Sequence, residues 1–387
     1  MKAIEATAPG EVVGRDTITR FDMQFQAAAY AALEILEGKG VDCVYCDFHE
    51  DFVVQRTING RAVYHFFQVK TKKRLHQQWT LADIFSLKKS GQKKDQESLE
   101  KVKQSFAGKL LVRGIVFTDQ CAEVTLLSNV YFNDDVVTAV EELRGKAPVG
   151  KAAKFLAENF SAIFELTERD DDFGAETLSK LSLKPAVRYI SETRDSFCTE
   201  ARRTVFDYSE IDLDHYEADE LANGLVNMVY EKSKIPLHNV PPEKIPELAG
   251  VRINDLLSVL SISKSAYQAL LDGEEPKALR SASVIQRWFK KAGCDDEMIA
   301  FCAQQKVNWD LWHRTARNVY LHIDLALLLK RLDDVTALWV RAGAEFEELL
   351  KLIKALSEEP HVLKFEGLTS DLLFGGINSV LVRSYAK

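Results

Sequence analysis

Residues 47–74 bring an acid, an amide and an amine together if they form a β-hairpin. Two runs rich in β-branched and aromatic residues flank Asn59 and Gly60. This pair tolerates the positive φ angles of a two-residue type I′ turn, and such a turn fixes the register of the strands. We expect Ile58 to face Arg61 across the turn, so that facing residues have numbers that add to 119.

This register sets Asp51 opposite Gln68, with both side chains on one face of the sheet. A strand repeats every two residues, so Lys70 shares that face while Val69 points to the other side. Hard cations such as Mg²⁺ or Mn²⁺ take oxygen ligands, which Asp51, the Gln68 side chain and the Val69 carbonyl could supply. Lys70 would orient or deprotonate the attacking water and offset the charge of a phosphorane-like transition state.

The alternative is a solvated surface hairpin whose polar residues have no chemical role. Against it, His65, Phe66, Phe67 and Val69 place aromatic or aliphatic groups on both faces of the second strand. This pattern predicts a central strand that is buried on both sides. Charges at the end of such a strand are costly unless they are paired or bound to a metal.

The order of Asp51 and then Gln68-Val69-Lys70 resembles the PD-(D/E)XK nuclease superfamily in its Gln-X-Lys variant. Together with Phe25-Gln26 on a predicted helix, the run of residues 47–51 resembles a narrower group. That group is the nuclease domain of bacterial anti-phage effectors, which is fused to SAVED domains or encoded beside HerA-type hexameric ATPases. The resemblance covers roughly the first third of the chain.

The resemblance implies a restriction-endonuclease-like α/β fold, with a mixed sheet flanked by helices, and cleavage of double-stranded DNA with Mg²⁺ or Mn²⁺. It also implies that Gln26 contributes to the active site. Glu34 is a candidate for the acid that the first helix often supplies in this superfamily, although several helical Glu residues could fill that role and a solvated helix residue is the favoured interpretation. The second half of the chain does not resemble a SAVED domain, which points to a HerA-type ATPase as partner, with self-association expected.

The charge is distributed unevenly along the chain. The net charge is −8, but residues 70–113 carry twelve Lys or Arg against four Asp or Glu, a local net charge of +8. A basic surface beside the predicted site is where phosphate contacts would form, although a solvated helix face rich in Lys is the alternative. The candidate DNA-binding residues are Lys72, Lys73, Arg74, Lys88 and Lys89.

Composition suggests a cytoplasmic protein. No run of about eighteen uncharged apolar residues is present, and the N-terminus has no basic region followed by an apolar one. We therefore expect neither a membrane span nor a signal peptide. The six cysteines are scattered through apolar or helical contexts, which is typical of reduced thiols.

Strand and helix patterns alternate through the first part of the chain, which predicts the layered α/β architecture. A first helix, capped by Asp16 or Thr17, should run to about Leu36. The other expected elements are a strand over Val41 to Phe48, helices over Leu81 to Leu87 and Gln96 to Phe106, and strands over Leu110 to Phe117 and Glu123 to Tyr131, with Thr118 and Asp119 ending a strand.

The second part of the chain has helical periodicity from Asp134 onward. Residues 234–247 hold four of the nine prolines, a density that predicts a non-helical connection. We therefore divide the chain into a nuclease domain with a helical extension (1–233), a proline-rich linker (234–247) and an all-α domain for assembly or partner docking (248–387).

The leading hypothesis is a divalent-metal-dependent DNA endonuclease of an anti-phage system. Its main alternative is a non-catalytic adaptor that binds DNA or assembles a motor complex, because Gln68 replaces the second acid of the usual metal site. A third hypothesis is an RNA nuclease.

Overall fold

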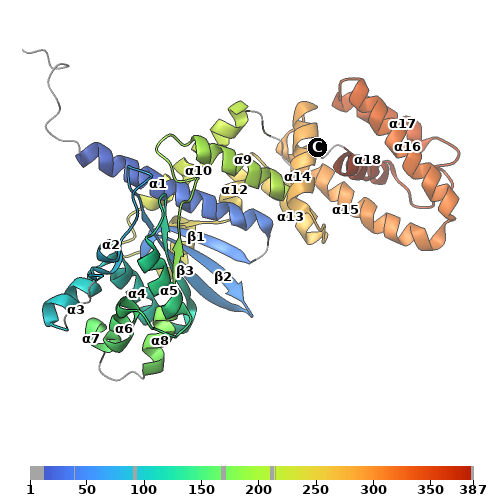
Figure 1. Cartoon of the computed structure of the whole chain (residues 1–387). Helices are drawn as coiled ribbons and strands as arrows, with labels where there is room; N and C mark the ends of the chain where they lie inside the picture. Colours follow the sequence, from blue (N-terminus) through green and yellow to red (C-terminus); the bar gives the residue numbers. More distant parts are fainter. Residues whose placement is uncertain are drawn as a thin grey trace, which may run out of the picture. The chain divides into compact units, whose positions relative to one another are not determined.

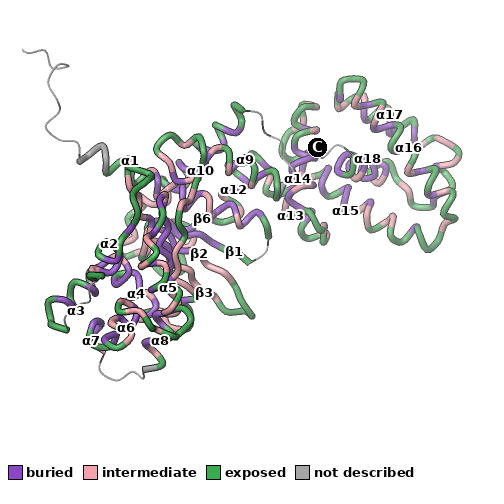
Figure 2. Tube along the Cα trace, in the orientation of Figure 1, coloured by how far each residue is buried: buried purple, intermediate pink, exposed green. Residues whose placement is uncertain are grey.

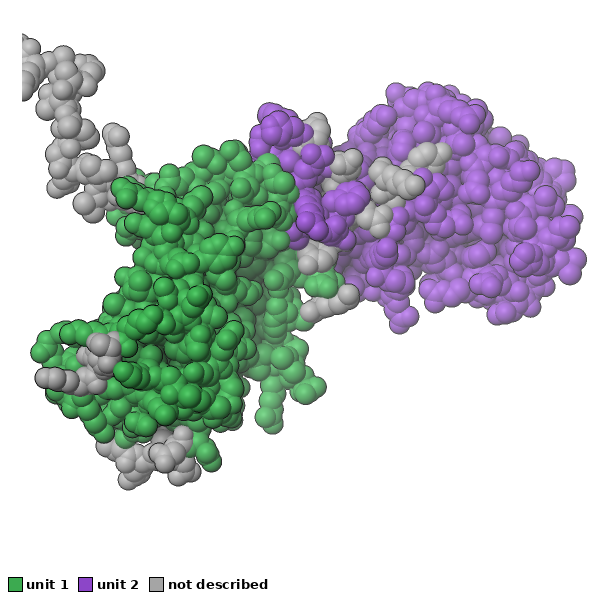
Figure 3. All heavy atoms as spheres, viewed as in Figure 1, with its two compact units in different colours: residues 1–201, 222–253 green, residues 202–221, 254–387 purple. Residues whose placement is uncertain are grey.

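The computed structural model describes residues 13–38, 40–89, 94–166, 171–209, 213 and 215–384. The chain forms two compact units (Figure 3). Unit 1 comprises Met1–Ala201 with Ala222–Ile253, and unit 2 comprises Arg202–Leu221 with Asn254–Lys387.

Unit 1 is built on a six-stranded mixed sheet with the strand order β5-β4-β3-β2-β1-β6. Figure 1 labels β1, β2 and β3 of this sheet. β3 pairs in parallel with β4 and β4 with β5, whereas the other pairs are antiparallel. β3 is therefore an interior strand, as predicted. The strands are β1 (Val41–Phe48), β2 (Glu50–Ile58), β3 (Arg61–Lys70), β4 (Cys121–Ser128), β5 (Leu181–Lys184) and β6 (Gly250–Val251).

The predicted hairpin register is confirmed from the turn as far as Phe52 opposite Phe67, whereas the predicted pair of Asp51 and Gln68 lies one position beyond the last observed pair. β2 and β3 pair from Ile58 opposite Arg61 down to Phe52 opposite Phe67. The two turn residues, Asn59 and Gly60, have φ angles of 52° and 76°. These positive angles are the conformation for which Asn-Gly is favoured.

One row of paired residues crosses five strands and builds the main core of unit 1. Tyr45, Val53, Phe66, Val124 and Leu181 face one another in successive strands, and all belong to one buried cluster. In Figure 2, purple, the colour of buried residues, gathers along the strands of this sheet. Apolar residues of the helices that follow β3 and β4 complete this cluster. The alternation of β3 then places Gln68 and Lys70 on the same face as Phe66.

The opposite face carries α1 (Val13–Leu33), which contacts β1, β2 and β3. Buried alanines, including Ala28 and Ala29, let the helix approach the sheet closely. The helix begins before the predicted cap at Asp16 or Thr17, and a 3-10 turn (Glu34–Glu37) ends it. On this face the rings of Phe52 and Phe67 stack with their centroids 4.5 Å apart.

The expected strand over Leu110 to Phe117 is wrong, because this segment belongs to helix α4 (Phe106–Phe117). Ser105 caps the helix by accepting a hydrogen bond from the Gly108 N–H. A short apolar run fits a buried strand and a buried helix equally well, and tertiary packing decides between them. Thr118 and Asp119 consequently follow a helix and lie in a 3-10 turn rather than ending a strand.

The remaining elements of unit 1 are mostly helices. The proline-rich stretch, expected to be non-helical, contains a 3-10 turn (Pro242–Lys244) and α11 (Ile245–Leu248), each with Pro in its first turn, where no backbone N–H is needed. β5 and β6 were not predicted, and β6 pairs with β1. The other helices are α2 (Leu81–Phe85), α3 (Gln96–Lys103), α5 (Asp134–Arg144), α6 (Lys151–Glu158), α7 (Phe160–Phe164) and α8 (Asp171–Ser179).

Unit 2 is helical around a core that includes the buried rings of Trp309, Trp339 and Phe289. α9 (Asp195–Ser209) and α10 (His215–Ser233) contribute residues to both units. In the part of the chain that the structure describes, no helix has the length and apolar character needed to span a membrane. Besides α9 and α10, the helices of unit 2 are α12 (Ile253–Val259), α13 (Lys264–Asp272), α14 (Ala278–Lys291), α15 (Asp296–Val319), α16 (His322–Arg341), α17 (Phe346–Ser357) and α18 (Ser370–Ser384).

Candidate active site

Asp51 lies at the start of β2, just beyond the last pair of the β2–β3 register. Its Oδ2 accepts a hydrogen bond of 2.6 Å from the backbone N–H of Val69, and the Gln24 side chain of α1 also hydrogen-bonds this carboxylate. Burial raises the pKa of Asp51, whereas the Val69 hydrogen bond and the charge of Lys70 oppose that rise. The carboxylate is thus fixed in place and costly to ionise.

Lys70 ends β3 beside two carboxylates. Burial lowers the pKa of Lys70, and the negative charges of Asp51 and Glu50 counteract this effect. The Lys70 Nζ lies 4.6 Å from the centroid of the Phe106 ring, at the start of α4. The amine predicted from the sequence is therefore close enough to interact with the predicted acid.

A second buried carboxylate, Glu50, was not predicted as a site residue. Its side chain is 6% exposed and accepts a hydrogen bond of 2.8 Å from Arg113 Nε of α4. Burial raises the pKa of Glu50, and Arg113 opposes the rise. The position of Glu50 directly before Asp51 was the available signal. Arg113 could not be placed, because its segment was expected to be a strand.

Gln68 has one amide atom bonded and the other unsatisfied. Its Nε2 donates to Glu50 Oε2 at 3.3 Å, whereas its Oε1 is buried without a hydrogen-bond partner. A buried acceptor without a donor costs free energy unless a ligand or water satisfies it. An amide oxygen of this kind, one residue before Val69, whose N–H bonds the Asp51 carboxylate, fits the oxygen-ligand chemistry of Mg²⁺ or Mn²⁺.

A metal centre of a different kind is not found. Among the described residues, no group of three or more His, Cys, Asp or Glu side chains could hold a metal ion. The predicted set relies instead on one carboxylate, one amide oxygen and the Val69 carbonyl. Its ability to bind metal stays a prediction.

Gln26 lies on α1 and uses its whole amide for protein contacts. Its Nε2 donates to Asp22 Oδ2 at 2.7 Å and to the Ser191 carbonyl at 3.0 Å, and its Oε1 accepts from the Ser191 N–H at 3.2 Å. Gln26 is fully buried and ties the helix to the segment around Ser191. Its contribution to catalysis stays a prediction, whereas Gln24 is the residue of this helix that contacts Asp51.

The candidate first-helix acid, Glu34, contacts a different part of β2. Its Oε2 accepts a hydrogen bond of 2.7 Å from Arg56 Nη2, five residues along the strand from Asp51. On the preceding turn of the helix, Tyr30 stacks on Tyr189 with ring centroids 3.9 Å apart.

The predicted DNA-binding residues differ in how they are held. Lys72 Nζ donates to the Gln78 carbonyl at 2.9 Å and to Asp83 at 3.2 Å, and Lys89 Nζ lies 2.8 Å from Asp135. The exposed members of the set are Lys73, Arg74, Lys88 and Lys89. None of these contacts tests DNA binding, which stays a prediction.

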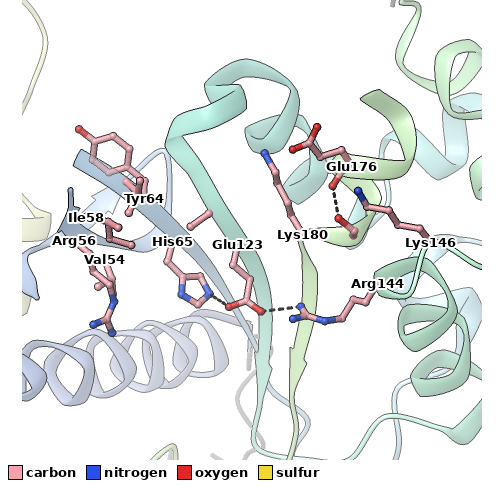
Figure 4. A pocket seen from close by; sticks show the side chains of 13 residues that line it. Val54, Arg56, Ile58, Tyr64, His65, Glu123, Arg144, Lys146, Glu176 and Lys180 are labelled. Atoms are coloured by element: carbon pink, nitrogen blue, oxygen red, sulfur yellow. Dashed lines mark hydrogen bonds and ion pairs between the residues drawn. The ribbon is translucent and has the colours of Figure 1, made fainter. Parts of the chain in front are cut away.

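A separate cavity of about 520 Å³ lies near the start of β4 (Figure 4). There, His65 Nε2 lies 3.1 Å from Glu123 Oε2, and Glu123 Oε1 accepts a hydrogen bond of 2.8 Å from Arg144. Burial lowers the pKa of His65 to about 4, although the charge of Glu123 opposes the change. The charges of Glu123 and Arg144 are therefore paired within this cluster, whereas Gln68 Oε1 has no hydrogen-bond partner.

Comparison with known proteins identifies one family. Residues 13–233 match the family model described as the Cap4 dsDNA endonuclease domain. A search of curated proteins gave no match.

Three solved structures of a SAVED/CARF-domain containing receptor, Cap4 of Acinetobacter baumannii, also match. One is described with the cyclic trinucleotide 3'3'3'-cAAA and one with 2'3'3'-cAAA. Sequence identities are 11%, 10% and 10%, and the TM-scores are 0.36, 0.37 and 0.36. The matches cover 67%, 80% and 73% of this chain but only 46%, 60% and 66% of those proteins.

Proposed function

The chain belongs to the family of the Cap4 dsDNA endonuclease domain, and from this premise we propose that it is a divalent-metal-dependent endonuclease of an anti-phage defence system. It hydrolyses phosphodiester bonds of double-stranded DNA. The observation that carries the proposal is made at one end of the β2–β3 pair. There Asp51 accepts a hydrogen bond from the Val69 N–H, the charges of Asp51 and Glu50 act on Lys70, and Gln68 Oε1 is buried and unsatisfied.

The metal site would consist of Asp51, Gln68 Oε1 and the Val69 carbonyl oxygen. When bound there, Mg²⁺ or Mn²⁺ would polarise the phosphate and lower the pKa of a coordinated water. The Val69 N–H holds the Asp51 carboxylate in one orientation. Glu50 orients Gln68 by accepting a hydrogen bond from its Nε2. The Oε1 atom then has no hydrogen-bond partner and could coordinate a cation.

Lys70 would act on the attacking water and on the transition state. In hydrolysis, the water oxygen bonds to phosphorus, one P–O ester bond breaks, and the leaving oxygen takes a proton. A buried amine beside two carboxylates can orient the water and offset the charge that develops on the phosphate oxygens. The same ammonium partly neutralises Asp51 and Glu50, which lets a polyanion approach them.

The finer biology is also part of the proposal. The protein acts in the cytoplasm, self-associates and works with a HerA-type hexameric ATPase, and unit 2 supplies the docking surface. Exposed apolar side chains on α16, namely Leu327 and Ile323, support an assembly role for this unit. Co-purification of the full-length chain with its neighbouring gene products tests this part.

The catalytic proposal is tested by incubating plasmid DNA with the purified full-length protein and Mg²⁺ or Mn²⁺. We expect cleavage that EDTA abolishes and that Lys70→Ala reduces by at least about 100-fold, a typical loss for a group that stabilises transition-state charge. Lys154→Ala, which removes an exposed lysine of α6, is the matched control and should cut normally.

Equal cleavage by Lys70→Ala would indicate a contaminating nuclease and contradict the assignment. DNA binding without cleavage, in the presence of the co-purified partner, would favour the adaptor. A parallel reaction with labelled RNA and DNA duplexes separates the DNA endonuclease from an RNA nuclease.

A further inference from the structure

A cavity of about 510 Å³ lies between α1 and α10 in unit 1. Three aromatic rings line it: Phe21 stacks on Phe25 with centroids 6.3 Å apart, and Tyr230 meets Phe25 edge to face at 5.8 Å. Phe21 and Tyr230 are 49% and 45% exposed. The cavity thus presents aromatic surface to solvent rather than to the protein core.

The cavity adjoins the candidate active site. Asp47, at the end of β1, lines the cavity, and its charge acts on Asp51. On α1, Gln24 hydrogen-bonds the Asp51 carboxylate, while its neighbours Phe21 and Phe25 line the cavity. One turn of a helix therefore contributes to both places.

The lining suits a flat ring with polar edges. Asn227, Ser233 and Asp47 offer hydrogen-bonding groups beside the aromatic rings, and Lys234 Nζ lies 4.9 Å from the centroid of the Tyr230 ring. A mostly apolar pocket with a few polar groups is typical of a small-ligand site. The wall formed by Asp22 and Arg194 is held rigid by their ion pair.

A nucleobase has this shape and chemistry, and it stacks on aromatic side chains whatever its identity. Inside a duplex, both faces of a base are covered by its neighbours in the stack. A base can use such a pocket only after it has rotated out of the helix.

We propose that the cavity lined by Phe21, Phe25 and Tyr230 receives an extruded nucleobase of the substrate strand, next to the phosphodiester held at Asp51 and Lys70. This inference rests on the proposed endonuclease function. It narrows the substrate to DNA in which one nucleotide can leave the stack, so the enzyme should prefer mismatched, frayed or easily opened steps.

The test uses full-length Lys70→Ala, which should bind DNA without cutting it, and a set of duplexes with 2-aminopurine stepped along one strand. The fluorescence of this base rises when it leaves the stack. We expect a rise on binding, and expect Phe21→Ala or Tyr230→Ala in the same background to remove the rise and weaken binding about tenfold. Phe21→Trp, which keeps a stacking ring, should preserve it.

Tyr216→Ala is the matched control, because Tyr216 is a 70% exposed aromatic residue of α10 that does not line the cavity. Binding is followed in parallel by fluorescence anisotropy. DNA binding without a fluorescence rise, or a rise that survives both alanine substitutions, would overturn the base pocket and leave the endonuclease standing. A rise that depends on Phe21, together with absence of cleavage by the unmutated protein in the presence of its co-purified partner, would support the pocket and overturn the endonuclease.

Discussion

Three ionisable groups of the candidate active site, Asp51, Glu50 and Lys70, are largely buried. Burial raises the pKa values of Asp51 and Glu50 and lowers that of Lys70. Burial therefore disfavours the charged form of each group, and the attraction between Lys70 and the two carboxylates opposes that effect. Perturbed groups of this kind are typical of catalytic sites, where folding free energy is given up to position reactive charges.

We expect Asp51→Asn to abolish cleavage and to stabilise the fold at neutral pH. Because the folded-state pKa of Asp51 is raised, this residue contributes most to stability below its unfolded-state pKa, about 4, and that contribution is lost as the pH rises through the folded-state value. Removing the buried charge should raise the melting temperature at pH 7 by about 2–4 °C, the shift that 1 kcal/mol produces in domains of 150–250 residues.

Melting curves between pH 4 and pH 8 check this expectation. The difference between Asp51→Asn and the unmutated protein should shrink as the pH falls toward the unfolded-state pKa, because the carboxylate then takes up its proton in the folded state and begins to do so in the unfolded state. Asp119→Asn, at an exposed position, is the control and should change little. A melting temperature that falls at pH 7 would contradict the role of burial at Asp51.

At the scale of elements, α4 positions the site. It brings Arg113 to Glu50 and Phe106 to Lys70, and its apolar side packs into the core under β3 and β4. The helix can approach α3 closely because position 108 has no side chain. A Cβ atom there would lie 2.1 Å from the Val102 carbonyl oxygen.

We expect Gly108→Ala to destabilise unit 1 strongly, because the new methyl group would meet backbone that cannot move away locally. Gly114→Ala, on the same helix, is the matched comparison, since its Cβ would meet only the Thr177 side chain at 2.9 Å. Overpacking of this kind lowers the free energy of unfolding by about 1–3 kcal/mol, and we expect the loss in Gly108→Ala to be at or above the upper end of this range. Urea unfolding followed by circular dichroism measures the free energy of unfolding of both variants. A larger loss of stability in Gly114→Ala than in Gly108→Ala would contradict the packing of α4 on α3.

At the scale of the whole molecule, an acidic protein carries one strongly basic segment. The net charge is −8, whereas residues 70–113 carry +8. Within that segment, Lys72 is engaged by Asp83, but Arg74 and Lys88 are exposed. If the segment holds DNA, the exposed cations rather than Lys72 should carry the salt-dependent part of the affinity.

We expect the double substitution Arg74→Glu with Lys88→Glu to weaken DNA binding and to flatten its dependence on salt. Each lost phosphate contact should lower the slope of log K against log salt by about 0.9. Arg317→Glu with Lys354→Glu changes the net charge equally at exposed positions of unit 2 and is the control. Anisotropy titrations at several salt concentrations measure the DNA affinity of both double variants. Equal losses of affinity would mean that the net charge of the protein, rather than the basic segment, determines DNA binding.

The hairpin that carries most of the candidate site could be predicted from local sequence. The alternation of apolar residues and the Asn59-Gly60 turn determine the β2–β3 register, because both act between neighbours along the chain. The same reasoning failed for residues 110–117, since an apolar run of this length has no decisive period. β5 and β6 escaped prediction because they are short and have partners far away in the sequence.

By itself, the sequence determined which residues of one hairpin could do chemistry, because turn type and strand alternation are local properties. The tertiary structure alone decided which distant side chains join them: Gln24 at Asp51, Arg113 at Glu50, and an aromatic cavity beside both. These contacts depend on how helices pack on the sheet. Packing is a property of the whole core, and no single segment specifies it.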